Sequence, residues 1–522
     1  MKEQSTRQST ISTFIVASST FISRILGFLR TAVITALFGA TGQADIINIV
    51  FAVPNNLRKL LAEGALSSAF IPVISQAVVE EGEDRKRSGT LARNIITFQL
   101  IVIIPICLVS LLLSRQLIEN VLTQFEDPEQ IELASSLFRF FINYLLFVGV
   151  SSVLIGVLNS HSRFFIPAIT PILFSITVIF SLLLLHRSLG VYSMALGVLL
   201  GGAAQVLFQL PLFRKLGYSL VPHFGFSNPD FKRVMKHWLP VLATSSVFTI
   251  NQQVAFLLAS GLETGSASSL AYALVFFQLP FGIFSTSITT VLFPKMSRQF
   301  GRGDTEGLRH SVQYGVRFLL ALLIPSAVIL GTLGREIVSI AIQRGMFTAE
   351  NTALTAFVLT GYCYGLFSVG AFNFLQRFFY SAKNYKLPFY IAFSVAAADI
   401  VLSIILKETP LRVAGLSIAN SVSFTLGFAA LFAASFRLLG GLSFRGILTT
   451  LWKTLVATIP VYAVLKVLQH LFGDYWSAGS SFRGLGLLLL QVAAAGFIYY
   501  VMYRLLKVEM MEQLIKKKGN NP

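Results

Sequence analysis

Long apolar segments constrain the fold of this 522-residue chain more than any other feature. About 20 apolar residues suffice for a helix to cross the hydrocarbon core of a bilayer. Hydropathy predicts about fourteen such helices, over residues 13–38, 44–78, 92–113, 134–159, 165–186, 190–213, 237–260, 268–294, 313–334, 352–380, 387–406, 412–436, 449–470 and 485–507. The longest connection, 214–236, is basic and is expected to be amphipathic. The sequence therefore predicts an all-α polytopic membrane protein without a sizeable soluble domain.

Composition and charge agree with this class. The chain is 54% hydrophobic and 12% charged, whereas soluble domains are about 25% charged. The net charge of +18 does not indicate nucleic-acid binding, because lysine and arginine fall mainly in short loops between apolar runs. Most of them lie on the side that holds both termini, which predicts cytoplasmic termini. Cys107 and Cys363 lie within apolar segments, so neither a disulfide nor a metal site is expected.

Short motifs recur at a spacing of about 221 residues. They pair Pro72 with Pro294, Pro105 with Pro325, Gly149 with Gly370, and Pro167 with Pro388. Such a repeat predicts two six-helix lobes, at 1–220 and 221–440, inserted the same way up as in parallel-repeat transporters. Residues 441–522 would add two further helices and a basic cytoplasmic tail.

Three arginines within the first two apolar segments are the strongest functional signal. Arg24, Arg30 and Arg58 have uncharged counterparts in the second repeat. A charge at membrane depth costs about 2.5–3.5 kcal/mol on insertion scales, and it is tolerated where it faces a polar cavity or a partner. Because a guanidinium group presents a fork of donors that suits phosphate oxygens, the arginines predict an anion site for a diphosphate. The alternatives are interfacial snorkelling or pairing with Asp45 or Glu63.

A second group of polar residues lies in the repeat's second copy. Asp399 is an acidic residue deep in an apolar segment, Ser403 lies one turn further on, and Asn251 lies midway along the seventh segment. Oxygen ligands of this kind suit Na⁺ or a proton relay. A polar packing contact is the alternative.

The opening segment resembles the signature of the MurJ (MviN) lipid II flippases, of the multidrug/oligosaccharidyl-lipid/polysaccharide exporter superfamily. The matching residues are Ser23-Arg24-Ile25-Leu26-Gly27-Phe28-Leu29-Arg30, Phe38-Gly39-Ala40, Asp45, Pro54-Asn55 with Leu57-Arg58, and Ala62-Glu63-Gly64-Ala65 with Ala69-Phe70. The helix number and the plan of six, six and two helices extend the resemblance over the chain.

The resemblance implies a lipid flippase of peptidoglycan biosynthesis rather than an enzyme. Its cargo would be undecaprenyl-diphosphate-linked disaccharide-pentapeptide, moved from the cytoplasmic to the outer leaflet of the bacterial inner membrane. By motif position, the substrate site would comprise Ser23, Arg24, Arg30, Asp45, Asn55, Arg58 and Glu63. The family also implies alternating access coupled to Na⁺, H⁺ or membrane potential, with no other cofactor. Other cell-wall synthesis proteins are possible partners.

Two positions depart from the family pattern. Thr31 follows the second arginine, where the family has an acidic residue, and Leu274 and Val275 stand where many members carry an acidic residue and an arginine. One alternative is a related exporter of another polyprenyl-diphosphate glycan or of drugs, although arginines repel cationic drugs. The others are a membrane glycosyltransferase, for which the short loops lack an acidic cluster, and a scaffold, which leaves the asymmetric arginines unexplained.

Overall fold

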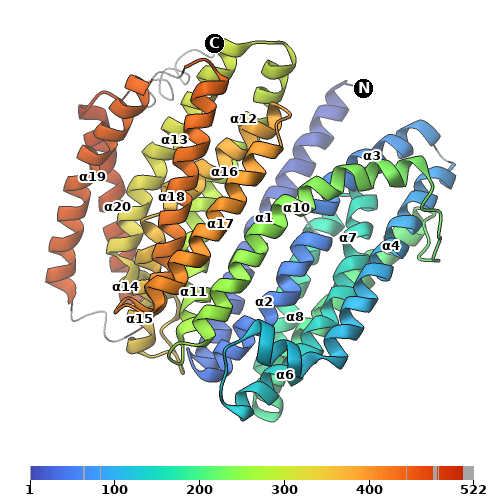
Figure 1. Cartoon of the computed structure of the whole chain (residues 1–522), viewed down its shortest axis with the longest axis horizontal. Coiled ribbons are helices and arrows are strands. Elements are labelled where there is room, and N and C mark those ends of the chain that lie inside the picture. The colour runs from blue at the N-terminus through green and yellow to red at the C-terminus, as the bar shows by residue number, and fades with distance from the viewer. Residues whose placement is uncertain are drawn as a thin grey trace. The chain divides into compact units, whose positions relative to one another are not determined.

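Every regular element in the described part of the chain is a helix. The computed structural model describes residues 2–62, 65–82, 84–441, 444–473, 479 and 481–508, with side chains from residue 18 onward except at 65, 244 and 444. Two compact units meet in the chain at residues 264 and 265. The first unit contains α1 (Lys2–Phe38), α2 (Gly42–Leu61), α3 (Ala65–Glu81), α4 (Lys86–Leu112), α5 (Ser114–Leu117), the π-helical turn η1 (Ile118–Leu122), α6 (Pro128–Ile142), α7 (Tyr144–Ser160), α8 (Phe165–Leu189), α9 (Tyr192–Lys215) and α10 (Pro229–Ser260) (Figure 1).

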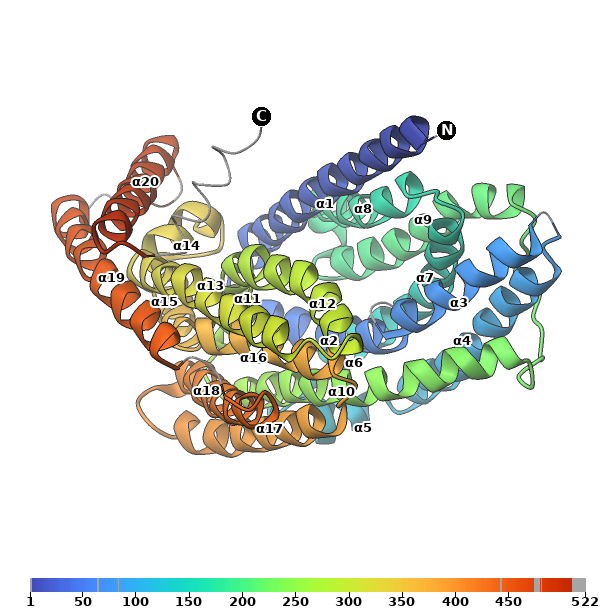
Figure 2. The ribbon, with the colours of Figure 1, turned by 90° about the horizontal axis from the view of Figure 1, so that it is seen from above.

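The second unit begins directly after that boundary. It contains α11 (Ser266–Pro280), the π-helical turn η2 (Phe281–Ser285), α12 (Thr286–Gly301), α13 (Thr305–Thr332), α14 (Gly334–Ile342), α15 (Ala349–Cys363), α16 (Leu366–Ser381), α17 (Lys386–Lys407), α18 (Arg412–Leu438), α19 (Phe444–Phe472) and α20 (Phe482–Leu505). The last two helices pack against each other and against α13 (Figure 2), around Leu333, Val461 and Leu488.

The predicted membrane spans are present. Within the described residues, 13 stretches are long and apolar enough to cross a membrane, and the bent pair α15–α16 raises the number to as many as 14. Each stretch coincides with one predicted span. The expectation of an all-α polytopic membrane protein with about fourteen spans is therefore confirmed.

Some spans consist of more than one helical piece, and the sequence explains two of these breaks. Pro280 ends α11 and the wider turn η2 follows, because proline has no N–H to donate and its ring crowds the preceding turn. α15 and α16 meet at a 47° bend. At that bend, a Cβ atom on Gly365 would lie 2.6 Å from the Cα atom of Ser421 on α18. Glycine therefore allows α18 to approach the bend.

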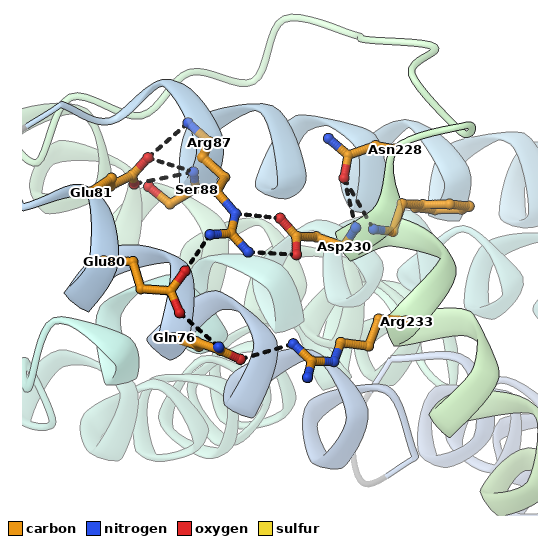
Figure 3. Close-up of polar contacts among 9 residues, drawn as sticks. Gln76, Glu80, Glu81, Arg87, Ser88, Asn228, Asp230 and Arg233 are labelled. Atoms are coloured by element: carbon orange, nitrogen blue, oxygen red, sulfur yellow. Dashed lines mark hydrogen bonds and ion pairs between the residues drawn. The ribbon is translucent and has the colours of Figure 1, made fainter.

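Helix α10 is tied to α3 and α4 by a cluster of charged side chains at its first turn (Figure 3). Arg87 on α4 donates through Nε and Nη2 to the two carboxylate oxygens of Asp230 on α10, at 2.6 and 2.8 Å, and through Nη1 to Glu80 on α3. Arg233 on α10 donates to Gln76 on α3 at 2.8 Å. Two-pronged, charge-assisted hydrogen bonds of this kind are among the stronger polar contacts in proteins. They fix the start of α10 on the first unit.

The connection before α10 differs from the predicted amphipathic segment. α9 continues to Lys215 and α10 begins at Pro229, so only 216–228 is irregular. Asn228 caps α10 by accepting from the backbone N–H of Asp230 at 2.8 Å. The buried amide of Asn94 on α4 donates to Gly225 O at 2.8 Å and accepts from Gly225 N at 3.1 Å. The connection is therefore held as irregular chain against α4 and does not form a surface helix.

The division into compact units and the predicted lobes assign α10 differently. The lobes inferred from the repeat meet at 220 and 221, which would place α10 in the second one. In the structure α10 packs on α2 and α3 of the first unit. The parallel repeat itself stays a prediction.

Candidate functional site

The arginine-rich segment forms parts of α1 and α2 in the first unit. Arg30 lies on α1, which packs along α8, and its guanidinium carbon lies 5.2 Å from the centroid of the Phe174 ring on α8. At this distance the cation is attracted to the negative face of the ring. Arg30 is half-buried, whereas Arg24, six residues earlier, is exposed. Six residues turn an ideal helix by about 120° from one face to another, which accounts for this difference.

Arg58 is positioned by its own helix. The helix α2 continues through Pro54, and Asn55 places its Oδ1 atom 3.2 Å from Nε and 3.0 Å from Nη2 of Arg58. This neutral acceptor orients the guanidinium group without cancelling its charge. Lys59 and Asn56, each one residue further along the helix, form the same kind of pair. The exposed Lys59 donates to Asn56 Oδ1 at 3.3 Å.

Arg30 and Arg58 lie on helices that contact each other, α1 and α2. Phe174 and Asn55, whose side chains contact the two guanidinium groups, are both uncharged. Where two guanidinium groups face one cavity they repel each other, and a ligand with negative charge relieves the repulsion. A common anion site of the predicted arginines stays a prediction.

Three further residues are predicted to bind the substrate, namely Asp45, Ser23 and Glu63. Asp45 is buried in the first turn of α2, where a negative charge is favoured by the helix dipole. Ser23 is half-buried on α1 next to the exposed Arg24. Glu63 lies outside the described residues. The roles of these residues in substrate binding stay predictions.

Asp399 on α17 has two polar partners in the second unit. Asn420 on α18 donates to its Oδ2 atom at 2.8 Å, and Ser403 donates to its Oδ1 atom at 3.4 Å. Asp399 and Ser403 are both buried, at 4% exposure. The structure thus shows these two side chains in contact and adds Asn420 to them, whereas their role as ion ligands stays a prediction. The only signal for Asn420 in the sequence was an amide within an apolar helix.

The third predicted ion ligand belongs to the other unit. Asn251 is buried on α10 of the first unit, so an ion site formed by all three residues stays a prediction. Among the described residues, no group of three histidine, cysteine, aspartate or glutamate side chains is arranged to hold a metal ion.

Comparison with known proteins decides the family. The family model described as lipid II flippase MurJ matches residues 34–486. The chain belongs to the MurJ family of lipid II flippases. The family members are transporters rather than enzymes, and the multi-pass helical fold agrees with this.

Individual MurJ-family relatives match most of the chain. A probable lipid II flippase MurJ from Borreliella burgdorferi is 32% identical, over 97% of this chain and 98% of the relative. One from Vibrio cholerae is 31% identical, over 80% of this chain and 81% of the relative.

Solved structures agree in fold. A lipid II flippase MurJ in an inward closed conformation matches with a TM-score of 0.77 and 25% identity, over 95% of this chain and 100% of the other. An inward-facing MATE-family multidrug resistance transporter of the MOP superfamily matches with a TM-score of 0.67, over 81% of this chain and 98% of the other. At 14% identity this second match concerns the fold alone.

Proposed function

We propose that this chain moves lipid II from the cytoplasmic to the outer leaflet of the bacterial cytoplasmic membrane by alternating access. Membership in the MurJ family supports this. The observation that carries the proposal is the pair of arginines on the contacting helices α1 and α2, with the Arg30 guanidinium group against the ring of Phe174 and that of Arg58 held by Asn55. A diphosphate that reaches these guanidinium groups gains charge-assisted hydrogen bonds.

The test is to replace Arg24, Arg30 and Arg58 one at a time by alanine and by lysine. A hydrogen bond to a charged group is worth about 1.5–3 kcal/mol, so each alanine variant should bind lipid II roughly ten- to a hundredfold more weakly. Each lysine variant should keep part of the activity, because it retains the charge and loses the fork. Membrane abundance and lipid II transport into proteoliposomes are measured for each variant.

The matched control is Arg115→Ala. Arg115 is an exposed arginine on α5, whose nearest carboxylate oxygens, on Glu132 and Glu119, are 3.8 and 3.9 Å away. This variant should transport lipid II at the normal rate. Normal abundance with normal transport in all three site variants would overturn the assignment of the arginines. Mass spectrometry of the lipid that co-purifies with the wild-type chain separates lipid II from another polyprenyl-diphosphate glycan.

The proposed transport cycle is coupled to Na⁺ or H⁺. Asp399, Ser403 and Asn420 support this part, because a buried carboxylate lies beside a hydroxyl and an amide group that both donate to it, within an apolar unit. Both termini would lie in the cytoplasm, and the chain would work beside the proteins that make and use lipid II.

A further inference from the structure

Phe174 contributes to the arginine site from a helix that carries no charged residue of that site. Its ring lies under the Arg30 guanidinium group, at 5.2 Å from the guanidinium carbon, and the side chain is 8% exposed. An acidic partner at this place would neutralise Arg30 and occupy its donors. An aromatic face attracts the cation and leaves all five N–H donors available for a ligand.

The ring of Phe174 belongs to a column of aromatic side chains. Tyr144 on α7 lies 5.2 Å from Phe174 between ring centroids, and Phe51 on α2 lies 6.3 Å from Tyr144. Phe51 is seven residues before Arg58, so the two share one face of α2. The column therefore links α1, which carries Arg30, to the face of α2 that carries Arg58.

Two adjacent glycines on α9 make room for this column. A Cβ atom on Gly201 would lie 2.8 Å from Cδ2 of Phe174, and one on Gly202 would lie 2.8 Å from Cδ2 of Tyr144. Both distances are shorter than van der Waals contact, so any larger residue would push the rings away. This explains the Gly-Gly pair in an apolar helix, where glycine costs about 1 kcal/mol relative to alanine.

We propose that Phe174 is a positioning residue for substrate binding, which holds the guanidinium group of Arg30 in place for the diphosphate of the lipid. The inference rests on the proposed function, since the ligand is lipid II. Phe174 does not touch the ligand in this account. It acts through Arg30 by restricting the movement of a long side chain that would otherwise lose conformational entropy on binding.

The test changes the electrostatics of the ring and keeps its shape. Phe174 is replaced in the full chain by mono-, di- and trifluorophenylalanine, which weaken the negative face of the ring step by step. Lipid II affinity and melting temperature are measured on the purified protein in nanodiscs. We expect the affinity to fall in steps, by about two- to tenfold over the series, with an unchanged melting temperature. Phe174→Leu should bind at least as weakly as the trifluoro variant.

The matched control is the same fluorine series at Phe138, which is buried in the same hydrophobic core of the first unit. This series should leave the affinity unchanged. An affinity that is flat across the Phe174 series, or that falls equally in both series, would overturn the positioning role. A wild-type chain that binds undecaprenyl diphosphate but not lipid II would instead overturn the proposed substrate, and the Phe174 series with undecaprenyl diphosphate would still test the contact.

Discussion

Single polar residues in the apolar helices of this protein have specific partners. Arg58 is held by Asn55, one turn earlier on the same helix. Arg30 on α1 contacts Phe174 on α8, and Asp399 on α17 accepts from Asn420 on α18. Hydrogen bonds and ring contacts compensate the cost of removing these groups from water. The charged member of each pair stands out in a sequence because it is rare in such a segment. The partner in each pair is an uncharged residue, which does not stand out in the sequence.

At this scale, Asp399→Asn is predicted to abolish the ion dependence of lipid II transport and to leave lipid II binding largely intact. Asparagine keeps the shape of the side chain and an oxygen that accepts from Asn420, but it removes the charge that a cation or proton needs. Transport is measured in proteoliposomes with and without Na⁺ and pH gradients.

Glu336→Gln is the control, because Glu336 is another buried carboxyl group of the second unit, bound by Gln469 at 2.8 Å. It should retain the ion dependence. If a well-folded Asp399→Asn variant responds to ions as the wild type does, Asp399 is a packing residue.

Helix α10 is attached to its neighbours by charged contacts at its first turn. Arg87 joins it to α4 and α3, and Asp230 is nearly buried, with 11% of its side chain exposed. Exposed ion pairs contribute about 0–1 kcal/mol, whereas the two-pronged geometry and the burial of Asp230 favour a larger contribution. The charged cluster therefore determines where α10 begins on the first unit.

A double-mutant cycle measures this contribution. Arg87→Met and Asp230→Asn should each lower the melting temperature, and the double variant should lose less than the sum of the two, with a coupling energy of about 1 kcal/mol. Glu80→Gln is the comparison, because the Glu80 side chain is 47% exposed and its pair with Arg87 should contribute less. Strictly additive losses would show that Arg87 and Asp230 do not stabilise α10 through each other.

For the whole molecule, the charge bias of the loops predicts the orientation in the membrane. The loop between α3 and α4 would be cytoplasmic, and the segment before α6 would lie outside. Lys86 and Glu126 are exposed positions in these two places, and the native cysteines Cys107 and Cys363 are buried.

Single cysteines at Lys86 and Glu126, in a chain with Cys107→Ala and Cys363→Ala, should react with an impermeant thiol reagent from opposite sides of the membrane. Lys86→Cys should react only in inside-out vesicles and Glu126→Cys only in right-side-out vesicles. Labelling of both from one side would contradict the predicted number of spans between them. Transport of lipid II by the cysteine-free chain checks that the background is functional.

The sequence by itself determined the class, the spans and the arginines of this protein. A membrane span can be predicted from a local property, the apolar character of about 20 consecutive residues. A charged residue within such a segment can also be recognised directly in the sequence. The tertiary structure decided which residues meet: Phe174 with Arg30, Asn420 with Asp399, and Asp230 with Arg87 across 143 residues. It also placed α10 on the first unit. These pairings depend on the rotation and register of packed helices, which arise from many contacts distant in the chain and leave no local pattern.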